Sequence, residues 1–181
     1  MTRAGVARLS TAFIASVCLS GLVASAQGGG KYSAALVSDQ EVPAVSSQAS
    51  GTITLDIDED NEEITYELSF TGLSSVVAQA HIHLGQPSVN GGIMLWLCEG
   101  TSVSPLASTP TCPQSGSVTG TLTPADVVAI GGNNSGQQIS AGEFAEAVAA
   151  IKKGLAYANV HTAISGGGEI RGQIRQGAGH K

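Results

Sequence analysis

Apolar and polar residues alternate along much of this sequence, which is the pattern of strands with one buried face. In residues 52–57, isoleucine and leucine alternate with threonine and aspartate, and residues 64–70 repeat the alternation after an acidic stretch. We predict that these two runs form an antiparallel hairpin with one face in water. Similar runs predict further strands at 31–36, 80–85, 93–98, 117–122, 157–162 and 169–175.

Two later stretches follow a helical pattern instead. A short helix is predicted from Thr123 to Ile130, because a threonine N-cap is followed by a proline at the first helical position and then by Asp126. A second helix is predicted at about 141–153, where apolar residues recur at helical spacing and two lysines lie in the last turn. The expected fold is mainly β: a Greek-key-like antiparallel β-sandwich of about seven to nine strands with two short inserted helices.

The first 26 residues do not belong to this pattern. Arg3 and Arg8 precede a largely apolar stretch at 9–23, which is followed by the small residues Ala24-Ser25-Ala26. The apolar stretch is short for a membrane span of ~20 residues, so we expect cleavage, no transmembrane span afterwards, and a secreted or periplasmic protein. The predicted organisation is a signal peptide at 1–26, a flexible lead-in at 27–30, one domain at 31–175 and a disordered tail at 176–181.

The charge of the chain excludes nucleic acid as a partner. The sequence has 8 Lys+Arg and 14 Asp+Glu, and loss of Arg3 and Arg8 with the signal peptide leaves 6 against 14, a net charge of −8. Phosphate binding requires a basic surface instead. The acidic residues gather at 56–63, which lacks the glycine and the ligand spacing of an EF-hand calcium loop, so we predict a solvated hairpin tip there.

Two cysteines, Cys98 and Cys112, remain in the predicted mature chain. An even pair in an oxidising compartment favours a disulfide bond, which would close a loop rich in serine, threonine and proline. The alternative is that both cysteines bind a metal ion, which their wide spacing and the lack of a second cysteine pair disfavour.

Three of the four histidines are placed to meet on one face of the predicted sheet. His81 and His83 share a face of the strand at 80–85, and His161 lies in the strand at 157–162, whereas His180 falls in the predicted tail. Neutral imidazole is a good ligand for copper and zinc. The first interpretation is therefore a metal site in which His81, His83 and His161 hold one copper or zinc ion.

The second interpretation is a buried polar cluster without a metal ion. The strands at 157–162 and 169–175 place Asn159, Glu169 and Arg171 where they could hold the imidazoles through charge-assisted hydrogen bonds. Beside a metal ion, Glu169 or Asn159 would instead be the acceptor that fixes a histidine tautomer, and the positive charge of Arg171 would oppose the binding of a cation. Both interpretations stay open from the sequence.

Four segments of the chain, in the right order, resemble the CHRD domain, the module named after chordin. They are Gln40–Pro43, Ala80–Gly85, Asn159–Thr162 and Gly168–Ile174, and the resemblance covers roughly residues 31–175. It implies a secreted β-rich domain that occurs in many bacterial proteins, often alone after a signal peptide. The family carries no established biochemical activity to transfer, and the chain lacks the cysteine-rich modules that accompany the domain in chordin.

A fainter resemblance connects the His-x-His strand and Arg171 to copper/zinc superoxide dismutases. Those enzymes use four copper histidines and a zinc site that shares one of them, whereas this chain offers three histidines. The sequence also has no Gly-x-Ser-x-Gly elbow, no His-Glu-x-x-His motif and no phosphate loop. We therefore expect a non-enzymatic binding or structural module of CHRD type, whose partner is an unknown envelope or extracellular protein or matrix component. The alternatives are a three-histidine copper or zinc protein and, less favoured, an unidentified secreted enzyme of dismutase or hydrolase type.

Overall fold

The computed structural model describes Met1, residues 29–131 and residues 136–177. The predicted signal peptide, residues 27–28 of the lead-in and residues 178–181 of the tail lie outside these ranges, apart from Met1. Gly30 and Gln176, which the sequence assigned to the lead-in and the tail, are both paired in strands. The strands are β1 (Gly30–Val37), β2 (Ser50–Asp58), β3 (Glu63–Thr71), β4 (Val77–Leu84), β5 (Ile93–Glu99), β6 (Gly116–Leu122), β7 (Ala156–Thr162), β8 (Ile170–Gln173) and β9 (Arg175–Gln176).

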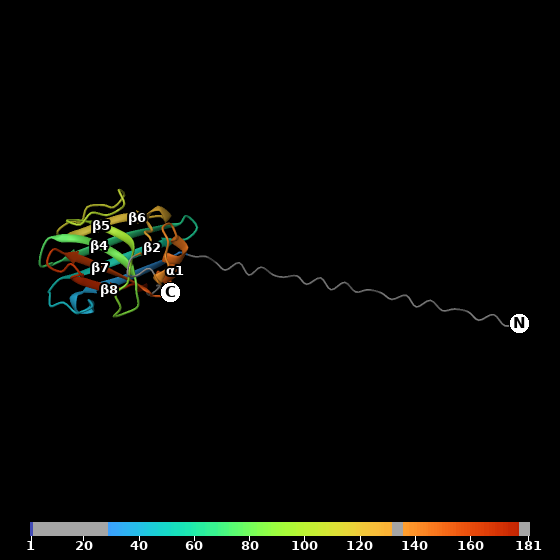
Figure 1. Cartoon of the computed structure of the whole chain (residues 1–181), viewed down its shortest axis with the longest axis horizontal. Coiled ribbons are helices and arrows are strands. Elements are labelled where there is room, and N and C mark those ends of the chain that lie inside the picture. Colours follow the sequence, from blue (N-terminus) through green and yellow to red (C-terminus); the bar gives the residue numbers. More distant parts are fainter. Residues whose placement is uncertain (2–28, 132–135, 178–181) are drawn as a thin grey trace.

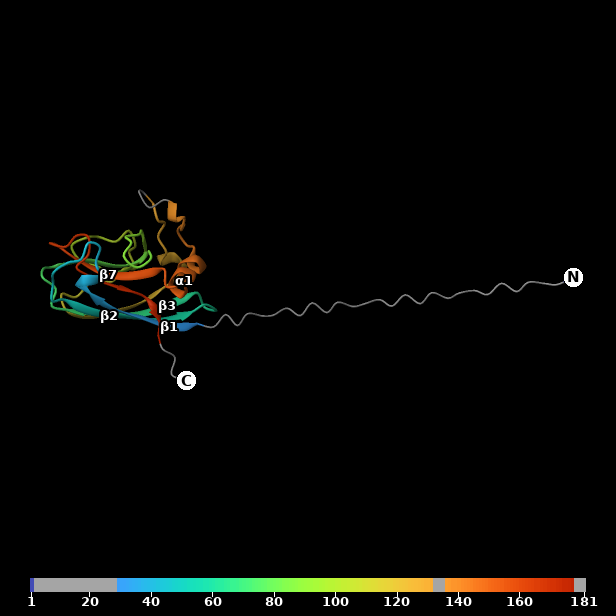
Figure 2. The same cartoon turned by 90° about the horizontal axis from the view of Figure 1, so that it is seen from below.

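All strands belong to one antiparallel sheet, in the order β5-β4-β7-β8-β1-β2-β3-β6, with β9 also paired to β1. The sheet curls until it is nearly barrel-shaped, and Figure 2 shows β7 in one layer with β1 and β2 in the other. Tyr66 on β3 donates a hydrogen bond from its hydroxyl to the carbonyl of Leu97 on β5, which links one end of the strand order to the strand next to its other end. The mainly β, antiparallel prediction is confirmed, and the two layers are parts of one curled sheet.

The inner faces of the two layers form the hydrophobic core. In β2 and β3 the alternation is the one predicted, since isoleucine and leucine are buried and their neighbours are mostly exposed. Strands β4 and β7 are buried at nearly every position, so their outer face is covered as well. The acidic stretch forms the exposed turn between β2 and β3, where the Asp58 carboxylate accepts hydrogen bonds from Asp60 and Asn61.

The two predicted helices are both present but shorter than expected. Helix α1 (Phe144–Lys152) lies at one end of the molecule (Figure 1) and buries Phe144, Val148 and Ile151. The predicted helix at 123–130 is a single 3-10 turn, η2 (Pro124–Asp126), in which the Asp126 carboxylate accepts two hydrogen bonds from Thr123. It ends after one turn because the next residue, Val127, forms a β-bridge with Leu95 of β5. A second 3-10 turn, η1 (Ser38–Gln40), follows β1.

The predicted disulfide between Cys98 and Cys112 is present, and it closes a segment with a sequence separation of 14 between the cysteines. It joins the end of β5 to the loop at 100–111, where Glu99 also exchanges backbone hydrogen bonds with Pro110 and Cys112. These contacts hold the loop against the edge of the sheet.

We expect the Cys98→Ser/Cys112→Ser double variant to lose about 3 kcal/mol of the free energy of unfolding, because a cross-link across a loop of this length restricts the unfolded chain by that amount. Urea denaturation with and without reductant measures the difference. Reductant should destabilise the wild type and leave the double variant unchanged. Equal urea midpoints for the oxidised wild type and the variant would show that the cross-link contributes nothing to stability.

Candidate metal centre

The outer face of β4, β7 and β8 carries a second core, which is polar. Three loops cover it, at 38–49, 85–92 and 163–169. Because β4 alternates, Ala80 and Ile82 point into the hydrophobic core while His81 and His83 point outward, and β7 lies beside β4 with Asn159 opposite His81. The polar side chains buried on this face or under its loops are Glu41, His81, His83, Asn159, His161, Thr162, Glu169 and Arg171.

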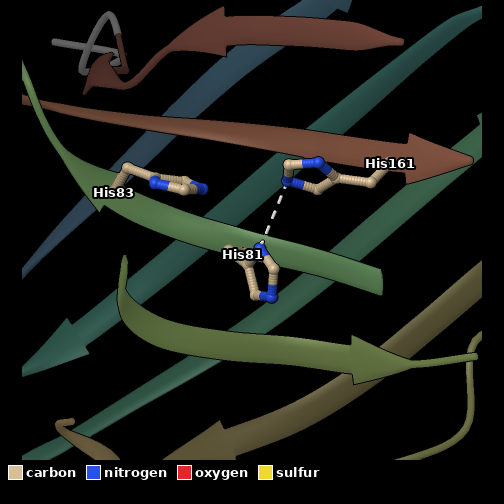
Figure 3. Close-up of side chains that lie close together, drawn as sticks. All are labelled: His81, His83 and His161. Carbon is tan, nitrogen blue, oxygen red and sulfur yellow. Dashed lines mark hydrogen bonds between the residues drawn. The ribbon is translucent and has the colours of Figure 1, made fainter. Parts of the chain in front are cut away.

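The three predicted histidines converge as expected (Figure 3). His81 and His83 come from β4 and His161 from the neighbouring β7, and one nitrogen from each ring lies within 4.8 Å of the other two. Nδ1 of His81 is 3.3 Å from Nε2 of His161. Among the residues that the structure describes, these form the one group of histidine, cysteine or acidic side chains with the spacing of metal ligands.

The distances fit a copper or zinc ion after a small adjustment. Two nitrogens that each lie ~2.0–2.1 Å from a tetrahedral zinc ion are roughly 3.3–3.4 Å apart, which matches the separation of 3.3 Å between His81 and His161. The separations within the group extend to 4.8 Å at most, so the rings must approach one another by up to about 1.5 Å to complete the site. Three imidazoles would leave one tetrahedral position for water or an external ligand.

Backbone carbonyls determine which ring nitrogens are available. Nδ1 of His83 lies 2.9 Å from the carbonyl oxygen of Gly91, and Nδ1 of His161 lies 3.0 Å from that of Gly166. A carbonyl can only accept, so in the neutral rings both Nδ1 atoms carry the proton and both Nε2 atoms are unprotonated. Without a metal ion, Nε2 of His161 accepts a hydrogen bond from Nδ1 of His81, so His81 must give up that proton before its Nδ1 can bind an ion. Within the described residues, Nε2 of His83 is buried without a hydrogen-bond partner, which is what a metal ligand needs in the absence of its ion.

Burial keeps all three imidazoles neutral. Desolvation, followed by repulsion from His161 and His83, lowers the pKa of His81 from 6.5 to about 2. Desolvation also lowers the pKa of His83 to about 4, against an opposing effect of its hydrogen bond to Gly91, and it lowers the pKa of His161. Protons therefore compete with a metal ion for these nitrogens only at a pH below the ordinary value for histidine.

The aromatic neighbours hold the rings in place. The ring of His83 stacks on that of Tyr157 with a centroid distance of 4.8 Å and an interplanar angle of 4°. His81 meets Trp96 edge to face at 4.2 Å. The sequence placed Trp96 in a core without a link to the histidines and gave Tyr157 no role, because contacts across neighbouring strands depend on a register that alternation alone does not fix.

Glu169, predicted beside the histidines, has its hydrogen bonds elsewhere. Its carboxylate accepts hydrogen bonds from Ser47, Ser74 and Thr162. Burial raises the pKa of Glu169, but these hydrogen bonds outweigh burial and hold it below its usual value. The carboxylate joins two loops to the end of β7, and the acceptors for the Nδ1 protons of His83 and His161 are backbone carbonyls.

Asn159 and Arg171 lie within the polar core, as predicted, but their contacts differ from those expected. Asn159 lies between Glu41 and His83, where its side chain lowers the pKa of the former and raises that of the latter. Arg171 donates to the loop at 85–92 and not to a histidine. Of the predicted contacts, Asn159 therefore lies beside the His83 imidazole, whereas Arg171 acts on the loop at 85–92.

Glu41 is a buried group that the sequence analysis did not identify as part of the site. It is 5% exposed, and desolvation raises its pKa to about 7 despite the opposing effects of Arg171 and Asn159. Its Oε1 atom has no hydrogen-bond partner among the described residues. The sequence used Gln40–Pro43 only as part of a resemblance, and a polar residue in a loop carries no periodic signal that would place it under the sheet.

The fold and the site together define an all-antiparallel β module with a polar cluster buried under its loops. The chain belongs to the CHRD domain family, whose sequence model matches residues 32–174. Neither a curated protein nor a solved structure matches the chain. Within the described ranges, no helix has the length and apolar character needed to cross a membrane.

Proposed function

We propose that this CHRD-domain protein is an exported, non-enzymatic binding module that holds one copper or zinc ion at His81, His83 and His161. The observation that carries the proposal is the convergence of three buried, neutral imidazoles, each able to offer a nitrogen within 4.8 Å of the others. Copper(II) has the highest affinity among divalent ions for such nitrogen sites, and zinc suits tetrahedral imidazole coordination.

Export is supported by two independent features. The CHRD domain is in general an extracellular module, and the bond between Cys98 and Cys112 requires an oxidising compartment. The protein then works in the periplasm or outside the cell, where its ion or its loops contact an envelope or matrix component. A bound ion would supply a Lewis acid at this site, and the chain's own residues orient the imidazoles that would hold it.

The protein, purified without a polyhistidine tag and stripped with a chelator, should bind one copper(II) or zinc ion in a calorimetric titration. We expect a dissociation constant below about 10 μM at pH 7.5, on the order of −7 kcal/mol or stronger. The His81→Ala/His83→Ala double variant should lose this binding. His180→Ala is the matched control, because it removes a histidine from outside the proposed site.

Two results would contradict the proposal. One is the absence of stoichiometric binding by the wild type for both ions. The other is unchanged binding by the double variant, since the ion would then be held elsewhere. If the wild type binds nothing and His81→Ala is strongly destabilised, the histidines serve only as a structural polar cluster, in which the loss of one imidazole leaves buried partners unpaired.

A further inference from the structure

Arg171 is a buried cation whose hydrogen bonds go to a loop. It is 2% exposed and forms no ion pair within the described part of the chain. Its Nη1 donates to Oδ1 of Asn90 at 3.0 Å, and its Nη2 donates to the carbonyls of Gln86 and Val89 at 3.2 and 2.8 Å. The guanidinium also stacks on the Tyr157 ring, 3.4 Å from its centroid. One side chain therefore holds three positions of the segment 86–90.

The next residue of that loop is the one that contacts His83. The Gly91 carbonyl accepts the proton on Nδ1 of His83, and the Gly91 amide donates to the Tyr157 hydroxyl at 3.2 Å. Gly91 also packs so closely on β4 that an added Cβ would lie 1.6 Å from the carbonyl oxygen of Leu84. Two sets of contacts therefore fix the orientation of the Gly91 carbonyl. Arg171 holds the preceding residues 86–90, and Tyr157 bonds to Gly91 directly.

We propose that Arg171 is the positioning residue for His83: by clamping residues 86–90 it presents the Gly91 carbonyl to Nδ1 and so keeps the lone pair of Nε2 directed at His81 and His161. This inference rests on the proposed function, because the role of Arg171 is to prepare His83 for a metal ion. The tautomer of His83 can nevertheless be measured in the metal-free protein. It also explains why a cation lies near a site for a metal ion. The planar guanidinium makes directed bonds to several acceptors at once, which a lysine ammonium does not reproduce.

The test is the tautomer of His83 in the metal-free protein, read from the nitrogen-15 chemical shifts of its imidazole at pH 7.5. The wild type should show a single form with the proton on Nδ1. In Arg171→Lys, which keeps the charge but not the fork of donors, and in Tyr157→Phe, we expect a mixture of both tautomers. Tyr66→Phe is the matched control, because it also removes one buried hydroxyl bonded to the backbone, and it should leave His83 unchanged.

A folded Arg171→Lys protein in which His83 keeps the proton on Nδ1 would overturn the inference. If Arg171→Lys does not fold, Asn90→Ala decides, because Asn90 is exposed and the change removes one arm of the clamp while the buried arginine stays. A mixture of tautomers in Asn90→Ala supports the clamp, and a single unchanged tautomer overturns it.

A second measurement connects the clamp to metal binding. Affinity for zinc, titrated in the same variants, should fall about 10–100-fold in Arg171→Lys, as is usual when a group that orients a ligand is lost, and should not change in Tyr66→Phe. The two proposals fail separately. A wild type that binds no ion removes the proposed function while the tautomer still decides the role of Arg171, and unchanged affinity in Arg171→Lys counts against Arg171 alone.

Discussion

Replacing Glu169 with alanine should lower the free energy of unfolding by roughly 3–5 kcal/mol, because the change removes a buried carboxylate with four hydrogen bonds and leaves their donors unpaired. Glu169 is 0% exposed. Its carboxylate accepts from the Ser47 hydroxyl, from the amide and hydroxyl of Ser74, and from the Thr162 hydroxyl at 2.7–2.9 Å. The loop after η1, the loop before β4 and the end of β7 therefore share one acceptor.

Urea denaturation measures this effect against a matched control. Glu67→Ala changes an exposed glutamate on β3 and should alter stability by no more than about 0.5 kcal/mol. Glu169→Gln keeps the shape but loses the charge, so its loss should fall between those of the other two variants. A Glu169→Ala protein as stable as Glu67→Ala would show that solvent replaces the network at no cost.

Acid should destabilise the protein by roughly 4–5 kcal/mol between pH 6.5 and pH 4.5, with the buried histidines as the main cause. Their folded pKa values lie below the ordinary 6.5, so the unfolded chain binds more protons in this window. The stability that their neutral forms contribute is present above pH 6.5 and is lost as pH falls. Glu41 acts in the opposite direction, since its pKa is raised to about 7 and the folded protein binds its proton first.

The free energy of unfolding is measured by denaturation of the metal-free protein at several pH values. Its slope against pH gives the number of protons that the protein takes up on unfolding. His83→Gln should reduce the slope by about one proton, and Glu41→Gln should steepen it by about one, because each removes a single titrating group. A wild-type stability that stays constant from pH 6.5 to pH 4.5 would mean that these imidazoles are hydrated and not buried.

The alternation of residues was sufficient to predict the strands and the pair of histidines. Because side chains on a strand alternate, His81 and His83 had to share a face wherever β4 lay, and the hairpin of β2 and β3 follows the predicted faces residue by residue. The convergence of His161 additionally requires β7 to lie next to β4, which is a matter of strand order. Local patterns constrain that order only weakly, and they do not show that the two layers are one curled sheet.

The groups that orient the site could not be predicted for a different reason. The acceptors for His83 and His161 are the carbonyls of Gly91 and Gly166. Every residue has a backbone carbonyl, so the residue type does not show which carbonyl accepts a hydrogen bond. Glu169 shares a face with Arg171 in the predicted strand, but it precedes β8, directly after Gly168 with φ of 121°. There its long side chain reaches the loops at the end of the strand, whose positions depend on the whole fold.

The central place of β1 determines when this chain can fold. The strand pairs with β2 on one side and with β8 and β9 on the other, so the first strand requires the last ones as neighbours. Contacts of such long sequence separation form late and slowly, because the intervening chain must be ordered first. A chain whose synthesis has not reached residue 176 leaves one edge of β1 without these partners. The complete sheet therefore forms only after residue 176 has joined the chain, about 140 residues after β1 has been made.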